Sequence, residues 1–194
     1  MAEFFLELFS EEIPASLQRN LREKLLDEFQ EFFLKKTIKS KKSFSLSTPN
    51  RLVIVFQGLE KEIKTLSTEI RGPKTGSPEQ AIEGFIRSNR IEKKDLFKKT
   101  IEKGEFYFFK TKSESLKTHD LLVEFIPKLL ESYQWKKSMK WGEYNLNWGR
   151  PLKSILSVFD KKMIDFKFHH LTSSNSTFID KDYEDKKKIF KDFK

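Results

Sequence analysis

Two pairs of adjacent side chains in this sequence carry groups that could take part in acid–base or metal chemistry. Glu11 and Glu12 could act as a pair of carboxylates, and His169 and His170 could move protons or bind a metal ion. Glu11 and Glu12 also precede an apolar helical stripe, and acidic residues favour the positive end of a helix dipole. Adjacent strand residues point to opposite faces, which argues against one ion held by both histidines. Neither pair is therefore assigned a catalytic role.

Cations beside aromatic residues and Gly or Pro turns form a more informative group. Residues 137–142 read Lys-Ser-Met-Lys-Trp-Gly, and residues 148–152 read Trp-Gly-Arg-Pro-Leu. Interleaved cations and indoles can neutralise phosphates and stack on bases, or they can pack as a Trp cluster under an ordered turn. Arginine adds a planar fork suited to phosphate or carboxylate. The candidate ligand or interface contacts are Arg51, Arg71, Arg87, Lys137, Lys140, Trp141 and Arg150.

Several classes of chemistry lack their sequence signals. The chain has no Cys, so it has no disulfide framework, thiolate metal site or thiol nucleophile. Its three His do not have the spacing of zinc ligands. A Walker-type phosphate loop, a dinucleotide-binding fingerprint and a serine nucleophile elbow are all missing from the sequence. We therefore expect no metal ion and no cofactor on this chain.

The charge balance favours an anionic partner. Lys and Arg number 38 against 29 Asp and Glu among 194 residues, a net charge of +9. RNA, DNA or an acidic protein would suit this charge, although a generally Lys-rich composition would give the same total. No apolar run approaches the roughly 20 residues that span a bilayer, and the first residues lack the basic region of a secretory signal. A cytoplasmic protein without a membrane partner is expected.

The hydrophobic pattern predicts an α+β fold, a mostly antiparallel sheet with packed helices. Strands are expected at residues 2–9, 44–48, 51–56, 64–71 and 105–111, followed by a hairpin of 155–159 and 163–168. Helices are expected at residues 14–33, 77–90, 92–99 and 119–132. Pro127 predicts a kink or a restart in the last helix. Gly84 costs the helix at 77–90 about 1 kcal/mol relative to Ala, which predicts a close packing contact at that position.

Seven segments, read in order, resemble one family: the β subunit of the bacterial heterotetrameric glycyl-tRNA synthetase. They lie at residues 7–15, 48–52, 71–73, 81–88, 103–105, 137–142 and 150–152. Together they cover the chain from its first residue to about residue 170. The family pattern usually has Arg where Asn50 and Lys140 stand here. After residue 170 it usually carries a Thr-x-Gly-His-Arg-Phe-like segment, where this chain has Ser-Ser-Asn-Ser-Thr-Phe at 173–178.

The resemblance also implies a domain plan. Residues 1–170 would form the N-terminal region of such a β subunit, with two subdomains of about 1–73 and 74–170. Residues 171–194 would be a polar, Lys-rich segment that stops before the central and anticodon-binding regions.

The function implied by the resemblance is specific. Such an enzyme is an α2β2 assembly that joins glycine to tRNA-Gly with ATP and Mg2+, and its class II catalytic site, with the ATP, lies on the α subunit. We thus expect this chain to be an enzyme subunit that is not catalytic by itself and binds no cofactor. Its partners would be the α subunit and tRNA-Gly, and the seven candidate residues would contact tRNA or a subunit interface. The alternatives are a stand-alone RNA-binding module and a non-catalytic assembly domain.

Overall fold

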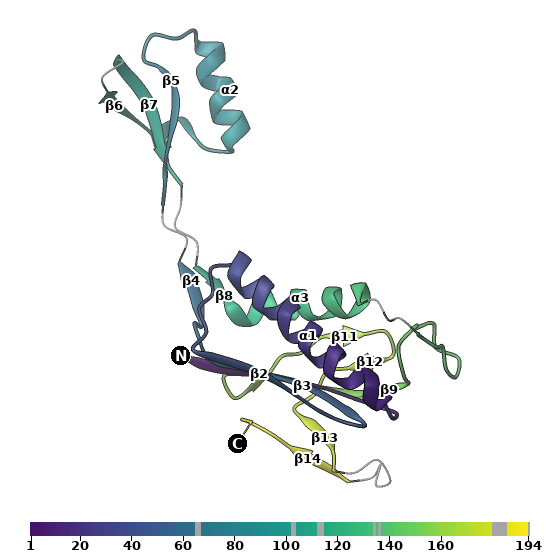
Figure 1. Cartoon of the computed structure of the whole chain (residues 1–194). Coiled ribbons are helices and arrows are strands. Elements are labelled where there is room, and N and C mark those ends of the chain that lie inside the picture. The colour runs from purple at the N-terminus through teal and green to yellow at the C-terminus, as the bar shows by residue number, and fades with distance from the viewer. Residues whose placement is uncertain are drawn as a thin grey trace. The chain divides into compact units, whose positions relative to one another are not determined.

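The chain forms two compact units, residues 1–63 with 116–194, and residues 64–115. The computed structural model describes residues 1–64, 67–101, 104–111, 115–133, 135, 137–179 and 186–193 (Figure 1). Part of the expected strand at 64–71 and Lys103 of segment 103–105 lie outside these ranges. The division differs from the expected one near residue 73, because β5 (Glu69–Lys74) pairs with β7 (Gly104–Lys110) inside the second unit.

The first unit is built on a five-stranded antiparallel sheet in the order β10-β9-β1-β3-β2. Its strands are β1 (Ala2–Ser10), β2 (Lys42–Thr48), β3 (Arg51–Leu59), β9 (Leu152–Phe159) and β10 (Lys162–Met163). The central strand β1 is paired on both sides, with Phe5 opposite Val55 on β3 and Val158 on β9. Both faces of the sheet are covered, and this explains why β1 is apolar at most positions rather than alternating. The expected β2–β3 hairpin is confirmed. β9 and β10 form the second hairpin, but the strand expected at 163–168 does not continue past Met163, because Lys167 and Phe168 pair with residues 171–172 instead.

Two helices cover one face of this sheet, α1 (Ala15–Lys35) and α3 (Thr118–Ser132) (Figure 1). α1 buries Leu25, Phe29 and Phe33 at helical spacing against the sheet. The Phe29 ring lies 5.4 Å from Phe4 of β1 and 5.1 Å from Phe125 of α3, measured between ring centroids. These contacts join both helices and the sheet into one aromatic core.

α3 is a single helix, so the alternative of a restart at Pro127 is wrong. A proline inside a helix removes one backbone hydrogen bond and crowds the preceding turn. Leu122 and Ile126 before the proline, and Leu129 and Leu130 after it, are all buried in the same core. Their burial offsets the local cost of Pro127.

The C-terminal segment covers the opposite face of the sheet (Figure 1). Strands β13 (Ser176–Phe178) and β14 (Lys187–Ile189) form a two-stranded ladder. After it, the Phe193 ring lies 6.3 Å from Phe5 of β1. Two further ladders are β4 (Glu62–Lys64) with β8 (Ser115–Lys117), and β11 (Lys167–Phe168) with β12 (Leu171–Thr172).

The second unit is a three-stranded antiparallel sheet in the order β5-β7-β6, with α2 (Glu79–Asn89) on one face (Figure 1). Phe85 of α2 packs on Phe109 of β7 at 5.7 Å between ring centroids. A Cβ atom on Gly72 would lie 2.6 Å from the Phe85 ring, so glycine lets the helix approach β5. Together the two units confirm the expected α+β fold with antiparallel sheets.

Two expectations about this unit are wrong. The helix predicted at 92–99 is one 3-10 turn, η1 (Lys93–Asp95), followed by β6 (Leu96–Ile101). Glu92 and Asp95 close that turn with a capping box, and the next residues gain ladder hydrogen bonds with β7. Gly84 makes no close contact with the residues that the structure describes, since a Cβ atom there would meet nothing within 4 Å.

Candidate functional site

Four of the seven family-like segments meet at one groove of the first unit. Its volume is about 700 Å³, and its wall includes Ile13, Pro49, Met139 and Pro151. Backbone hydrogen bonds hold the segments together: the Ile13 amide donates to the Pro49 carbonyl at 2.6 Å, and the Glu11 amide donates to the Pro151 carbonyl at 2.9 Å. Residues far apart in sequence are thus fixed to one another through the main chain.

Arg150 and Glu11, two charged residues of this groove, both have partners within the first unit. Arg150 donates from Nε to the carbonyl oxygen of Glu12 at 3.0 Å. Lys153 forms an ion pair with the Glu11 carboxylate at 2.8 Å. The Glu11 carboxylate therefore has a cationic partner of its own, which favours a structural role over a pair of catalytic carboxylates. Arg150 likewise holds the turn before α1 in place.

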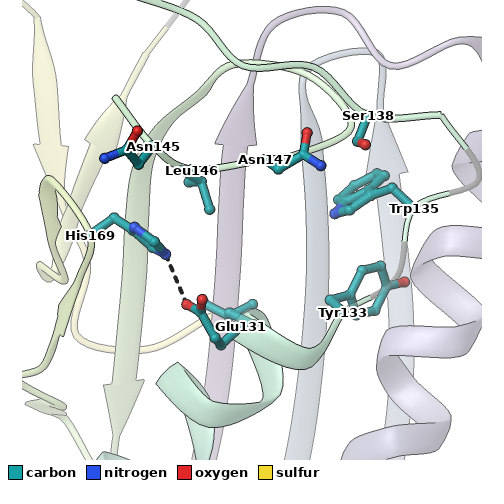
Figure 2. Close-up of a pocket in the computed structure, with 9 residues that line it drawn as sticks. Glu131, Tyr133, Trp135, Ser138, Asn145, Leu146, Asn147 and His169 are labelled. Atoms are coloured by element: carbon teal, nitrogen blue, oxygen red, sulfur yellow. Dashed lines mark hydrogen bonds and ion pairs between the residues drawn. The ribbon is translucent and has the colours of Figure 1, made fainter. Parts of the chain in front are cut away.

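A second cavity, of about 450 Å³, lies beneath the loop that carries Lys137 and Lys140 (Figure 2). Tyr133 and Trp135, just after α3, form an aromatic wall. Asn145 and Asn147 line it from the loop above. The cavity combines ring faces with side-chain amides, and it contains the donor and acceptor groups that could read a polar planar ligand.

An aromatic cluster supports this cavity. The Trp135 and Trp148 rings meet edge to face at 4.8 Å, and Tyr133 lies 5.9 Å from Trp148. Trp148 is buried, and its backbone pairs with Met139 through hydrogen bonds of 2.8 and 3.1 Å. Burial raises the pKa of Tyr133, whose hydroxyl donates to the Leu21 carbonyl at 2.9 Å. For Trp148, packing beneath an ordered turn is therefore the better interpretation.

The two adjacent histidines have different neighbours. His169 Nε2 lies 2.8 Å from the Glu131 carboxylate, the contact drawn in Figure 2. His170 stacks on Tyr144 at 3.6 Å and 9°. Burial and, to a smaller extent, the charge of His169 lower the pKa of His170. Among the residues that the structure describes, no three His, Asp or Glu side chains lie where they could share a metal ion.

Arg51 is engaged inside the first unit. Its guanidinium donates to the Glu7 carboxylate at 2.8 Å, to the Thr177 hydroxyl at 3.0 Å and to the Phe178 carbonyl at 2.5 Å. The same group lies 4.4 Å above the Phe9 ring. With only 18% of its side chain exposed, Arg51 attaches β13 to the central sheet.

The other predicted contacts fall into two places. Lys137 and Lys140 are exposed on the loop above the cavity, and Trp141 is half-buried beside them, with His170 5.9 Å away. Arg71 and Arg87 belong to the second unit, Arg71 on β5 and Arg87 in the last turn of α2. The structure places Arg150 at the groove and Lys137 and Lys140 on the neighbouring loop, and it leaves Arg51, Arg71 and Arg87 elsewhere. The pairing of Glu131 with His169 had no local sequence signal, because the two residues come from different elements.

The fold and its surfaces define a class before any comparison: an antiparallel α+β protein with a net positive charge and exposed cations beside aromatic rings. Within the described ranges, no helix is long and apolar enough to cross a membrane. The chain belongs to the glycyl-tRNA synthetase β-subunit family, whose model matches residues 4–194.

Curated relatives agree with this assignment. The glycine–tRNA ligase β subunit of Rickettsia canadensis is 38% identical over 198 residues, that of Rickettsia felis is 39% identical over 175, and that of Rickettsia bellii is 38% identical over 193. These matches cover 100%, 90% and 100% of this chain, but only 29%, 26% and 29% of the relatives. The chain thus spans less than a third of the length of the curated relatives it matches.

Proposed function

We propose that this chain is a non-catalytic part of a glycine–tRNA ligase β subunit. In this role it supports the ATP-dependent attachment of glycine to tRNA-Gly through subunit architecture and tRNA binding. The chemistry, with ATP and Mg2+, takes place on the α subunit of a cytoplasmic α2β2 assembly. The observation that carries the proposal is the family match over residues 4–194.

The arrangement of the first unit supports this division of labour. Family-like segments that are distant in sequence are locked together by main-chain hydrogen bonds, and Arg51 and Arg150 hold the chain internally. Exposed cations remain on the loop at 137–140, where they can meet phosphates.

Glycylation of tRNA-Gly by the cognate α subunit tests the proposal. The assay compares the α subunit alone, with this chain, and with a full-length β subunit. We expect charging only with the full-length β subunit, and a stable complex of this chain with the α subunit or with tRNA. Charging by the α subunit together with this chain, without the full-length β subunit, would overturn the expectation that further regions of β are needed.

The internal roles of Arg51 and Arg150 favour one alternative, a purely architectural domain. Such a domain would bind the α subunit tightly and show no RNA affinity at physiological salt. Filter binding of tRNA to the purified α2β2 enzyme, with variants confined to this chain, separates the two functions.

A further inference from the structure

The second unit has one sheet face that α2 does not cover. Side chains alternate along β7, and Phe109 is the one that meets Phe85 of α2. Phe106 and Phe108 therefore point to the opposite face. Register places Arg71 beside Phe108 and Lys99 beside Phe106 on that same face. We call this surface, made by β5, β7 and β6, the open face.

Cations lie over the aromatic rings of the open face. The Arg71 guanidinium is 3.9 Å from the Phe106 ring centroid, a stacking distance. Lys99 Nζ lies 5.7 Å from the Phe108 ring, and Lys110 Nζ lies 5.9 Å from Phe97. Phe106 and Phe108 are only 8% and 7% exposed, so the surface that a ligand would meet is cationic.

The open face carries one carboxylate against these three cations. Glu69 forms an ion pair with Lys99 at 2.5 Å and lies 3.9 Å from Lys110. The hydrogen bond from Lys99 lowers the pKa of Glu69. Arg71 has no ion pair with any residue that the structure describes, and its side chain is exposed. The net charge of the patch is therefore positive, and the exposed Arg71 guanidinium is available to a ligand.

This chemistry fits an unpaired stretch of RNA. Phosphates are the anions that a row of Arg and Lys neutralises. A guanidinium plane and half-buried rings such as Phe97 accept stacked bases. The sheet, covered by a helix on one side, thus presents on the other a cationic surface with the half-buried Phe97 ring beside it. An acidic protein would use the charges but not the guanidinium plane of Arg71 or the ring of Phe97.

We propose that the open face of the β5-β7-β6 sheet binds single-stranded nucleotides of tRNA, with Arg71 as its central contact and Lys99 and Lys110 as phosphate contacts. The proposal rests on the proposed tRNA-binding function and adds a second contact surface to the loop at 137–140. Glu69 limits the affinity, because it occupies the two lysines in the free protein.

The test measures tRNA-Gly binding by the α2β2 enzyme, with a full-length β subunit, by fluorescence anisotropy across a series of KCl concentrations. Lys99→Gln and Arg71→Gln should each weaken binding several-fold and reduce the salt slope by about 0.7. Phe97→Leu should weaken binding without changing the slope. Glu69→Gln should tighten binding several-fold, an effect that loss of folding cannot mimic.

Lys98 provides the matched control. It neighbours Lys99 on β6 but pairs with Tyr107, so it projects to the α2 side of the sheet. Lys98→Gln should leave affinity and slope close to wild type. Equal effects of Lys98→Gln and Lys99→Gln would overturn the proposal. So would variants that weaken α2β2 assembly but not tRNA affinity, since the face would then be a protein interface. A wild-type enzyme that failed to bind tRNA would overturn the proposed function as well.

Discussion

Gly149 lies directly against the indole ring of Trp135, with no room for a Cβ atom between them. Trp135 in turn meets Trp148 edge to face and lines the cavity beneath the 137–149 loop. The glycine is thus required by close approach rather than by a positive φ angle. This contact couples the Trp-Gly-Arg-Pro segment to the end of α3.

Gly149→Ala should therefore displace Trp135. The added methyl group overlaps the ring, and such overpacking costs about 1–3 kcal/mol of unfolding free energy. Urea unfolding and tryptophan fluorescence of the variant check this, with a shifted emission maximum expected in the folded state. Wild-type emission and stability in Gly149→Ala would contradict the close contact.

Gly84→Ala should stabilise the protein, whereas Gly149→Ala should destabilise it. Gly84 is exposed in α2, and a Cβ atom would meet nothing within 4 Å. Alanine should raise the unfolding free energy of the second unit by about 1 kcal/mol through helix propensity. Thermal unfolding followed by circular dichroism measures the change. A destabilised Gly84→Ala chain would show that another surface packs on this side of α2.

Arg51→Ala should loosen β13 from the central sheet. The substitution leaves Glu7, with 13% of its side chain exposed, without its arginine. Breaking a largely buried ion pair in this way costs about 3 kcal/mol. Hydrogen exchange should speed up at residues 176–178 before it does so in β1. Arg51→Lys keeps the charge but loses the forked guanidinium, so we expect an intermediate exchange rate. Equal exchange in the wild type and both variants would show that Arg51 does not attach β13 to the sheet.

Stability should depend on the protonation of His170. Burial lowers its pKa below the ordinary 6.5, so the unfolded chain takes up a proton first as the pH falls. The contribution of the neutral imidazole is present above about pH 6.5 and is lost as the pH drops toward the folded pKa. His170→Phe keeps a ring on Tyr144 and should flatten that part of the stability curve. An NMR titration midpoint of 6.5 or above would contradict the effect of burial.

The loop cations can be tested by kinetics. Lys137→Gln together with Lys140→Gln in a full-length β subunit should raise the KM for tRNA-Gly several-fold and leave kcat unchanged, because phosphate contacts contribute uniform binding. Lys161→Gln with Lys162→Gln, at the β9–β10 turn, is the matched control. A rise in the KM for ATP or glycine instead would argue against a tRNA contact.

Local sequence patterns determined most of the elements. Leu25, Phe29 and Phe33 recur at helical spacing, and α1 forms there because that spacing places all three on one buried face. The β2–β3 hairpin follows from its turn residues in the same way. The prediction of a helix at 92–99 was wrong. A lysine-rich run carries little periodicity, and the strand with which it pairs, β7, follows only after the next turn.

The family followed from short segments read in order along the chain. The sequence also showed that recognisable catalytic motifs are missing from it. Which segments meet was decided only by the tertiary structure. Strand register pairs Arg51 with Phe9 and so puts it on the same face as Glu7, and in the second unit it places Arg71 and Lys99 on one face of the sheet. Arg51 and Arg71 look alike in sequence, each beside a turn that contains proline. One is enclosed by Glu7 and β13 while the other stacks on Phe106 in solvent, because burial and partners are properties of packing and not of the residue itself.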